Sequence, residues 1–254
     1  MRPKKISKRR ANPSFADVEA VIEDERLYEL KDMLDERLIT DINMKCPITG
    51  VTLLTVACKT GCMYMVKLLL DRGAHINIYP RPGAPAFPMA GTALIAACDM
   101  GHLEVVKLLL LLRGADPNTV SEVKGTALME ACFQGHLEIV RMLIQYGAKL
   151  NTSIDGHLGT ALMAACYKPH LTVVELLLEN GVDVNAVDAD GCTPVMKAAE
   201  DGESALVKLL VLYGADVTCE NKAGETVYTY LKSDVKMTAF CDKHRDMNDQ
   251  KLLA

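Results

Sequence analysis

Apolar residues in this chain recur at helical spacing in short stretches that come in pairs. One pair occupies residues 126–133 and 137–146. The apolar side chains of the second stretch are Ile139, Val140, Leu143 and Ile144. A glycine separates the two stretches, and Gly147 follows the second, where a helix C-cap favours a left-handed residue. The polar segment that comes next fits a β-turn finger. Neither helix of such a pair buries its apolar face alone, so the pairs must stack on one another.

The pair is repeated along the chain at an almost constant interval. A threonine opens the first stretch of each unit, at Thr52, Thr92, Thr126, Thr160, Thr193 and Thr226. The intervals between these threonines are 40, 34, 34, 33 and 33 residues. Such a period is typical of arrays of helical repeats.

Two sequence runs carry a resemblance to a known family. Residues 192–199 (CTPVMKAA) and residues 114–118 (GADPN) resemble the front and back halves of the ankyrin repeat. The sequence pattern of that repeat consists, in order, of the motif Thr-Pro-Leu-His-x-Ala, a Gly-His turn and the motif Gly-Ala-Asp-x-Asn. The resemblance covers residues 17–235. It implies an all-α solenoid of stacked helix-turn-helix units with β-turn finger loops and a concave binding face.

The resemblance also divides the chain into segments. Repeats are expected near residues 17–49, 50–89, 90–123, 124–157, 158–190 and 191–223, with a partial repeat at 224–235. Residues 1–16 are expected to form a basic, disordered N-terminal arm. Residues 236–254 are expected to form a polar C-terminal cap or tail, because the terminal units of repeat arrays present polar outer faces.

The sequence departs from the family pattern at several points. Four prolines in residues 79–88 exclude a helix and predict an elongated finger. One extra residue in the third repeat predicts a π-bulge or a longer last turn at residues 108–112. Pro169 replaces the glycine between the helices of its repeat. The family's histidine, which makes a hydrogen bond in the turn, is replaced by Met129, Met163 and Met196.

Composition agrees with helix-on-helix packing. Half of the residues are hydrophobic, aromatic residues make up 5% and tryptophan is absent, so aliphatic side chains and methionine supply the core. The formal net charge of −5 argues against direct binding of nucleic acid. No run of about 18 apolar residues predicts a membrane span, and no apolar segment follows the basic N-terminus as in a secretory signal. The nine cysteines therefore indicate free thiols in a reducing compartment, the cytoplasm or the nucleus.

No residue pattern predicts catalysis. Cysteines recur six residues after the anchor threonine, at Cys58, Cys98, Cys132 and Cys166. Small buried residues explain them better than disulfides, because stacked helices lie about 8–10 Å apart. Their Cys-x-x-x-His spacings are spread one per repeat and do not converge on a metal. Since nucleophile and phosphate-loop motifs are also missing from the sequence, we expect no enzyme activity, metal, cofactor or small-molecule substrate.

Three sites are candidates for regulation or modification. Residues 1–10 carry six Lys or Arg and no acid. This segment is a solvated arm, or a nuclear-import or acidic-partner motif, or a segment that resembles a kinase substrate. Ser7 and Ser14 are candidate phosphorylation sites, since phosphate would offset the local charge. Asn185, with Leu177 eight residues before it, resembles ankyrin asparagines that are modified by asparaginyl hydroxylases. The favoured alternative is a structural asparagine that hydrogen-bonds its own backbone in a tight turn.

In ankyrin proteins the concave face is formed by finger tips and by the exposed ends of the inner helices. The family's contact positions, carried over to this chain, are Met89, Asp99, Met100, Glu130, Phe133, Gln134, Tyr167, Lys168, Lys197, Glu200 and Asp201. We expect Met100, Phe133 and Tyr167 to line up along the groove, either as binding hot spots or as covers of the helix ends. Glu200 and Asp201, together with Asp190, make its C-terminal end acidic, so a ligand with an apolar anchor and a basic flank fits it.

These observations favour a protein–protein interaction adaptor or scaffold whose partner is an extended peptide or a folded domain. A regulatory or inhibitory subunit of a kinase, phosphatase or transcription factor, acting through the basic arm, is the alternative. A purely architectural fragment is a third interpretation. The sequence alone does not identify the partner, because one fold hosts many functions.

Overall fold

The computed structural model describes residues 13–79, 91–112, 114–121, 124–154, 159–232 and 234–252, with the side chains of Leu112 and of residues 246–252 left aside. These residues fall into two compact units, residues 1–116 and residues 117–254. The finger at residues 80–88, Met89, Ser7 and the first twelve residues of the basic arm lie outside the described residues.

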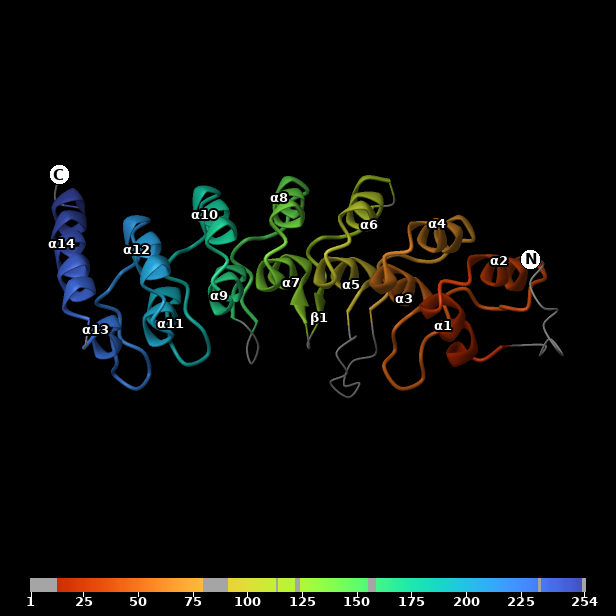
Figure 1. The fold of residues 1–254 in the computed structure, drawn as a ribbon, viewed down its shortest axis with the longest axis horizontal. Helices are drawn as coiled ribbons and strands as arrows, with labels where there is room; N and C mark the ends of the chain where they lie inside the picture. Colours follow the sequence, from red (N-terminus) through yellow and green to blue (C-terminus); the bar gives the residue numbers. More distant parts are fainter. Residues whose placement is uncertain are drawn as a thin grey trace. The chain divides into compact units, whose positions relative to one another are not determined.

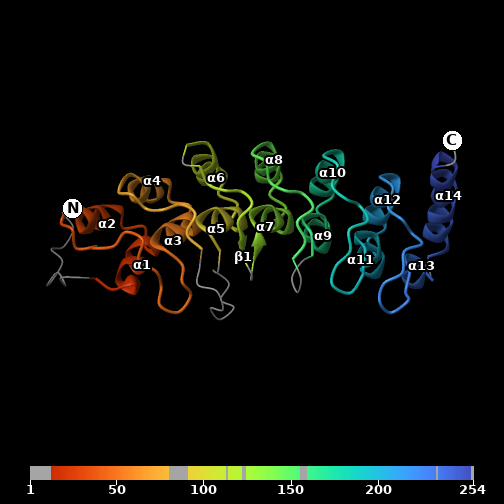
Figure 2. The same ribbon diagram turned by 180° about the vertical axis from the view of Figure 1, so that it is seen from behind.

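Unit 1 consists of consecutive helix pairs (Figure 1). Its helices are α1 (Phe15–Glu23), α2 (Leu27–Asp35), α3 (Leu53–Thr60), α4 (Met63–Asp71), α5 (Ala93–Asp99) and α6 (Leu103–Lys107), and α6 continues into the π-helix η1 (Leu108–Leu112). The first, or inner, helices of neighbouring pairs pack on each other, α1 on α3 and α3 on α5. The second, or outer, helices also pack in order, α2 on α4 and α4 on α6, and Figure 2 shows them from behind.

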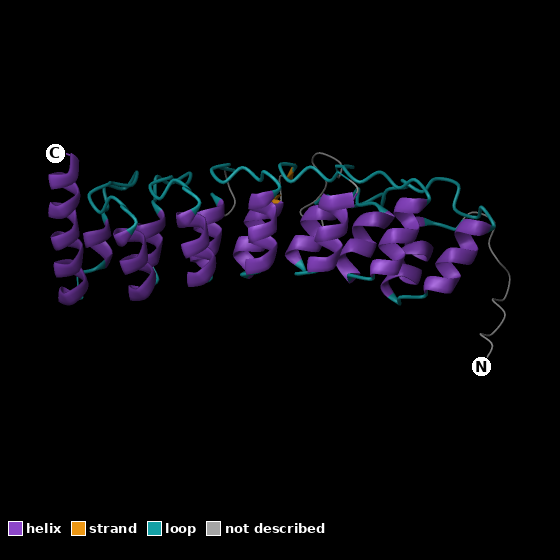
Figure 3. Ribbon diagram, turned by 90° about the horizontal axis from the view of Figure 1, so that it is seen from above, coloured by secondary structure: helices purple, strands orange, loops and turns teal. Residues whose placement is uncertain are grey.

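Unit 2 continues the same pattern. It contains the short strands β1 (Val120–Ser121) and β2 (Gly125–Thr126), and the helices α7 (Ala127–Gln134), α8 (Leu137–Gln145), α9 (Ala161–Tyr167), α10 (Leu171–Glu179), α11 (Pro194–Glu200), α12 (Ser204–Leu212), α13 (Val227–Tyr230) and α14 (Val235–Leu252). The strands pair antiparallel, with Val120 opposite Thr126. The inner helices α7, α9, α11 and α13 pack in order. Figure 3 shows that the loops of this unit gather along one edge of its helix layer.

The recurring threonines begin the inner helices. The hydroxyl oxygens of Thr52, Thr92, Thr126 and Thr160 each accept a hydrogen bond from the backbone N–H three residues later, at 3.2–3.4 Å. Such an N-cap satisfies one of the backbone donors that a helix start leaves without a partner. The repeat spacing of threonine is therefore the spacing of helix starts.

Methionine sulfur takes part in the same turns. The backbone N–H of Thr126 donates to Sδ of Met129, and that of Thr193 donates to Sδ of Met196, both at 3.5 Å. A thioether is a weak acceptor. Where the family pattern has histidine, these methionines thus still supply an acceptor to the turn, and their apolar chains are buried.

Finger asparagines join each repeat to the next. The side-chain oxygens of Asn43, Asn77, Asn118, Asn151 and Asn185 accept backbone N–H groups from the following finger at 2.7–3.1 Å. The Asn118 amide also donates to the carbonyl oxygen of Gly147 at 3.0 Å. For Asn185 we expected a hydrogen bond to its own backbone. Its side chain instead bonds the backbone of the next finger, at Gly214 and Asp216. These bonds fix the distance between fingers.

We expect Asn118→Ala to lower the free energy of unfolding by about 1–3 kcal/mol, because two backbone groups lose their partner. Asn180→Ala is the matched control, since the Asn180 amide bonds only Leu176 of its own helix pair, and we expect it to cost about 0.5 kcal/mol or less. Urea denaturation followed by circular dichroism measures both. Equal effects of the two substitutions would show that the link between fingers contributes little.

The extra residue of the third repeat is absorbed in the outer helix. In the other repeats an alanine, valine or leucine after the outer helix donates to a carbonyl oxygen five residues earlier, as Ala148 does to Leu143. In the third repeat Ala115 donates to Leu109, six residues earlier, across η1. Of the two alternatives predicted for residues 108–112, a π-bulge and a longer last turn, the structure has the π-helical turn.

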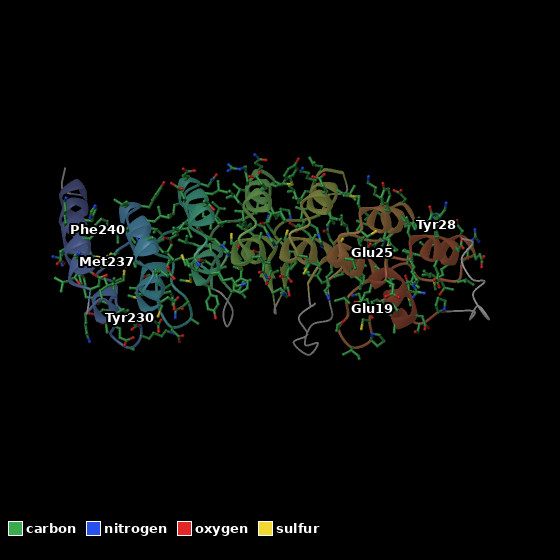
Figure 4. The ribbon with its side chains drawn as sticks, viewed as in Figure 1. Glu19, Glu25, Tyr28, Tyr230, Met237 and Phe240 are labelled. Atoms are coloured by element: carbon green, nitrogen blue, oxygen red, sulfur yellow. The ribbon has the colours of Figure 1, made fainter. Side chains whose placement is uncertain are left out.

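Both ends of the described chain are helical. Helix α1 begins at Phe15, two residues before the expected start of the first repeat, because Ser14 caps it and pairs with Asp17 in a capping box. At the other end α14 packs on α12 and buries Met237 and Cys241. The Tyr228 hydroxyl of α13 donates to Asp242 of α14 at 2.9 Å. Figure 4 shows Tyr230, Met237 and Phe240 on these last helices, and Glu19, Glu25 and Tyr28 on the first pair.

Candidate partner-binding site

Two aromatic side chains meet at the ends of adjacent inner helices in unit 2. Phe133 is the second-last residue of α7 and Tyr167 is the last residue of α9. Their ring centroids lie 5.6 Å apart with an angle of 32° between the ring planes. Tyr167 is 66% exposed and Phe133 is half-buried. An exposed aromatic pair in this geometry offers a partner a large, rigid apolar surface.

A lysine covers part of this pair. The Lys168 ammonium lies 4.1 Å from the centroid of the Phe133 ring. It also donates a hydrogen bond to Oε1 of Gln134 at 3.2 Å. A cation over an aromatic face at this distance is attracted by the ring's quadrupole. The four residues from α7, α9 and the following turn therefore form one contiguous cluster.

Pro169 determines the backbone that places Lys168 there. A proline disfavours helical backbone in the residue before it. Lys168 accordingly has φ −113° and ψ 107°, which is extended, and α9 ends at Tyr167. In the preceding repeat, α7 runs on through Gln134 and ends at Gly135, a left-handed residue with φ 78°. Helices α5 and α11 end at the same register as α9, but the residues that follow them, Met100 and Asp201, keep helical backbone. With proline in place of glycine, Lys168 is turned out of the helical conformation.

His170 hydrogen-bonds the backbone of the aromatic pair at Phe133. Its Nε2 donates to the carbonyl oxygen of Phe133 at 3.2 Å. In unit 1, His102 makes the equivalent bond to the carbonyl oxygen of Lys59 at 2.8 Å. A Cβ at Gly135 would meet the His170 ring at 2.5 Å. Glycine is therefore required at residue 135 both for its left-handed backbone and for the approach of His170.

The next inner helix of unit 2 presents charged residues at the same register. Counted from the anchor threonine, Glu200 corresponds to Phe133 and Tyr167, and Asp201 to Gln134 and Lys168. Both acids are exposed. We call the six residues Phe133, Gln134, Tyr167, Lys168, Glu200 and Asp201 the helix-end row.

Lys197 lies beside the acidic end of the row. Its ammonium is 3.7 Å from a carboxylate oxygen of Asp188 and 3.9 Å from one of Glu200. Partial burial opposes its charged form, but Cys192, Asp188 and Glu200 together raise the pKa of Lys197.

Tyr230 occupies the register of Lys197 in the next repeat, since each residue follows its anchor threonine by four positions. The Tyr230 hydroxyl donates a hydrogen bond to Glu225 at 2.7 Å, and this bond raises the pKa of Tyr230 to about 12. Tyr230 is not among the contact residues predicted from the sequence, although its register pointed to it.

Glu130 requires a correction. We expected it to contact a partner, but it is 2% exposed. Its carboxylate lies 3.6 Å from the ammonium of Lys124, which comes from the preceding finger. A carboxylate that is buried in this way offers no surface to a partner. The register from the anchor threonine places Glu130 correctly along the helix but does not show which finger covers it.

The remaining candidate residues lie apart from this cluster or outside the described residues. Asp99 ends α5 in unit 1 and is half-buried, and Met100 follows it with 48% exposure. Met89 is not among the described residues. Ser14 is exposed at the N-cap of α1, and Asn185 is held by its bonds to the next finger.

The recurring cysteines are core residues. Cys58, Cys98, Cys132 and Cys166 are buried free thiols. Burial raises the pKa of the Cys58 and Cys132 thiols, and it raises that of Cys166 to about 12. Burial thus favours the protonated form of the Cys58, Cys132 and Cys166 thiols. In the part of the chain that the structure describes, no group of three or more His, Cys, Asp or Glu is arranged to hold a metal ion.

Comparison with known proteins agrees with this geometry. The family model for ankyrin repeats, in three copies, matches residues 27–121, 91–154 and 152–221. The chain belongs to the ankyrin-repeat family. A crystal structure of the human ASB11 ankyrin repeat domain is similar to it, with a TM-score of 0.75 and 25% sequence identity over 89% of this chain and 96% of that one. The predicted all-α ankyrin fold is thus confirmed. Within the described ankyrin repeats, no helix has the length and apolar composition of a membrane span.

Proposed function

We propose that this protein is an interaction adaptor or scaffold and that the helix-end row of unit 2 is its main contact surface. Ankyrin repeats mediate protein–protein interactions and are typically non-catalytic. The observation that carries the proposal is the pairing of exposed Tyr167 with half-buried Phe133, at 5.6 Å between centroids. Aromatic side chains are enriched among the residues that dominate binding energy.

The proposed partner is a protein that presents an apolar side chain to this pair and basic side chains to Glu200 and Asp201. An extended peptide or a folded domain fits this description. The exposure of Tyr167 supports the first contact and the exposed carboxylates support the second. Asp190 in the finger before α11 adds to the negative charge. Direct binding of nucleic acid, a membrane or a small-molecule substrate is no part of the proposal.

The alternative of a regulatory or inhibitory subunit depends on the basic arm, of which residues 1–12 lie outside the described residues. The adaptor proposal is preferred because Tyr167 and Phe133 offer an apolar contact surface. Modification of Asn185 or Ser14 stays a secondary proposal. Asn185 would have to leave its bond to Asp216 before an enzyme reached it.

The proposal is tested by capturing proteins from a cell lysate on the wild type and on a Phe133→Glu/Tyr167→Glu variant. The matched control is Tyr146→Glu/Tyr213→Glu, which changes two partly exposed aromatic residues at the ends of outer helices in the same unit. All three proteins must show the same helical circular dichroism. We expect a protein held by the wild type and by the control to be lost from the first variant.

A further inference from the structure

The helix-end row carries two opposite charges one repeat apart. Lys168 follows α9 at the aromatic pair, and Asp201 follows α11 at the equivalent position. The Lys168 ammonium is held near Phe133 by the ring and by Gln134. Asp201 is exposed. A partner that lies along the row therefore passes a positive group first and a negative group next.

Lys168 is poised to bind an acidic group of the partner. An ammonium group has three N–H donors, and its hydrogen bond to Gln134 uses one of them. A partner carboxylate beside the apolar anchor can take another without moving Lys168 from the Phe133 ring. A basic residue in the same place would meet a like charge a few ångströms away, which is repulsive. Lys168 thus disfavours a partner with a basic residue at this place and favours a partner with an acidic residue next to its apolar anchor.

The acidic end of the row has the opposite preference. Negative charge at a helix C-terminus is unfavourable, because the backbone carbonyls already concentrate negative charge there. Glu200 and Asp201 stand at that end of α11. Lys197 neutralises part of the charge through its ion pair with Glu200, at 3.9 Å. A basic side chain of a partner beside Asp201 removes the remaining unfavourable charge.

The spacing of the helices sets the distance between the two contacts. Packed helices lie about 8–10 Å apart, and an extended chain advances about 3.3 Å per residue. One repeat therefore corresponds to about three residues of an extended peptide. The acidic contact at Lys168 and the basic contact at Asp201 should be separated by that number of residues.

We infer that the partner is a bipolar peptide segment, with an acidic residue next to its apolar anchor and a basic residue about three residues beyond the acidic one. Lys168 contacts the acidic residue and Asp201 contacts the basic residue. This inference rests on the proposed function. It adds an order of charges to the partner and makes Lys168 a specificity-determining residue. Pro169 is a positioning residue, because it turns Lys168 out of the helix.

The test uses fluorescein-labelled synthetic peptides and fluorescence polarisation. One set carries Glu next to a Phe anchor and Arg two to four residues beyond it. A second set has Glu and Arg exchanged, so its composition is the same, and a third has Gln in place of both. Each set is made in both chain directions. The proteins are the wild type, Lys168→Glu/Asp201→Lys, which keeps the net charge, and Lys168→Gln.

We expect the wild type to bind the first set at least tenfold more tightly than the second. The charge-exchanged protein should reverse this order, and Lys168→Gln should reduce the preference. Circular dichroism establishes that each variant is folded, and Lys168→Gln serves as the test if the double variant is not. Unchanged preference in the folded variants would overturn the inference.

Two further outcomes separate this inference from the proposed function. If the wild type binds all three sets equally and Phe133→Glu/Tyr167→Glu abolishes binding, the order of charges is wrong and the contact surface is right. If the wild type binds none of the sets, the bipolar peptide is wrong. The lysate capture then decides the proposed function independently, because its variants leave Lys168 and Asp201 intact.

Discussion

The Phe133→Glu/Tyr167→Glu variant is expected to bind the captured partner about 30- to 700-fold more weakly than the wild type, which corresponds to about 2–4 kcal/mol. The two rings provide the apolar area of the helix-end row, and each new carboxylate would have to be desolvated on binding. Isothermal titration calorimetry with the purified partner measures the change. The Tyr146→Glu/Tyr213→Glu control should stay within about threefold of the wild type, since most contacts outside a hot spot contribute little.

A loss of less than about fivefold would assign the binding energy to residues other than this pair. The single substitutions Phe133→Ala and Tyr167→Ala refine the result. If the rings act together as their 5.6 Å separation implies, a double-mutant cycle should give a coupling of about 0.5–1.5 kcal/mol. Additive effects would mean that the partner contacts the two rings separately.

Gly135→Ala is expected to have the second large effect, on stability. Residue 135 has φ 78°, and alanine there costs about 1–2 kcal/mol through its left-handed backbone. The added methyl would also meet the His170 ring, so His170 must move and the Phe133 carbonyl loses its hydrogen bond. We expect a total loss of about 2–5 kcal/mol in the free energy of unfolding, measured by urea denaturation.

Gly147→Ala is the matched control for this loss. Gly147 has φ 82°, but a Cβ there meets nothing within 4 Å. This control pays only the backbone cost of about 1–2 kcal/mol. If Gly135→Ala were no worse than Gly147→Ala, the approach of His170 would not be a constraint. A difference between them would identify His170 as a support for the backbone of Phe133.

Features that recur with the repeat could be predicted from the sequence. The anchor threonines mark helix starts because an N-cap is a local interaction of three residues. The extra residue before Gly114 pointed to a π-bulge for the same local reason, since a helix that gains a residue between fixed ends must widen a turn. The position of Phe133 and Tyr167 at the helix ends followed from their register.

Features that depend on contacts between repeats could not be predicted in the same way. Pro169 predicts extended backbone at Lys168, but the place of its ammonium over Phe133 depends on the neighbouring repeat. Glu130 is 2% exposed and lies 3.6 Å from Lys124 at the start of its own repeat, so its burial depends on how the finger folds back over the helix. The finger asparagine Asn185 bonds Asp216, 31 residues away. Side-chain contacts of this range depend on the stacking distance, which a one-dimensional pattern does not contain.

The most direct test of the central claim is photo-cross-linking from the helix-end row. Benzoylphenylalanine replaces Tyr167 in one protein and Tyr213, at the end of outer helix α12, in another. After irradiation of the complex with the captured partner, we expect a covalent adduct from position 167 and none from position 213. An adduct from position 213 without one from position 167 would contradict the account and place the partner on the outer helices.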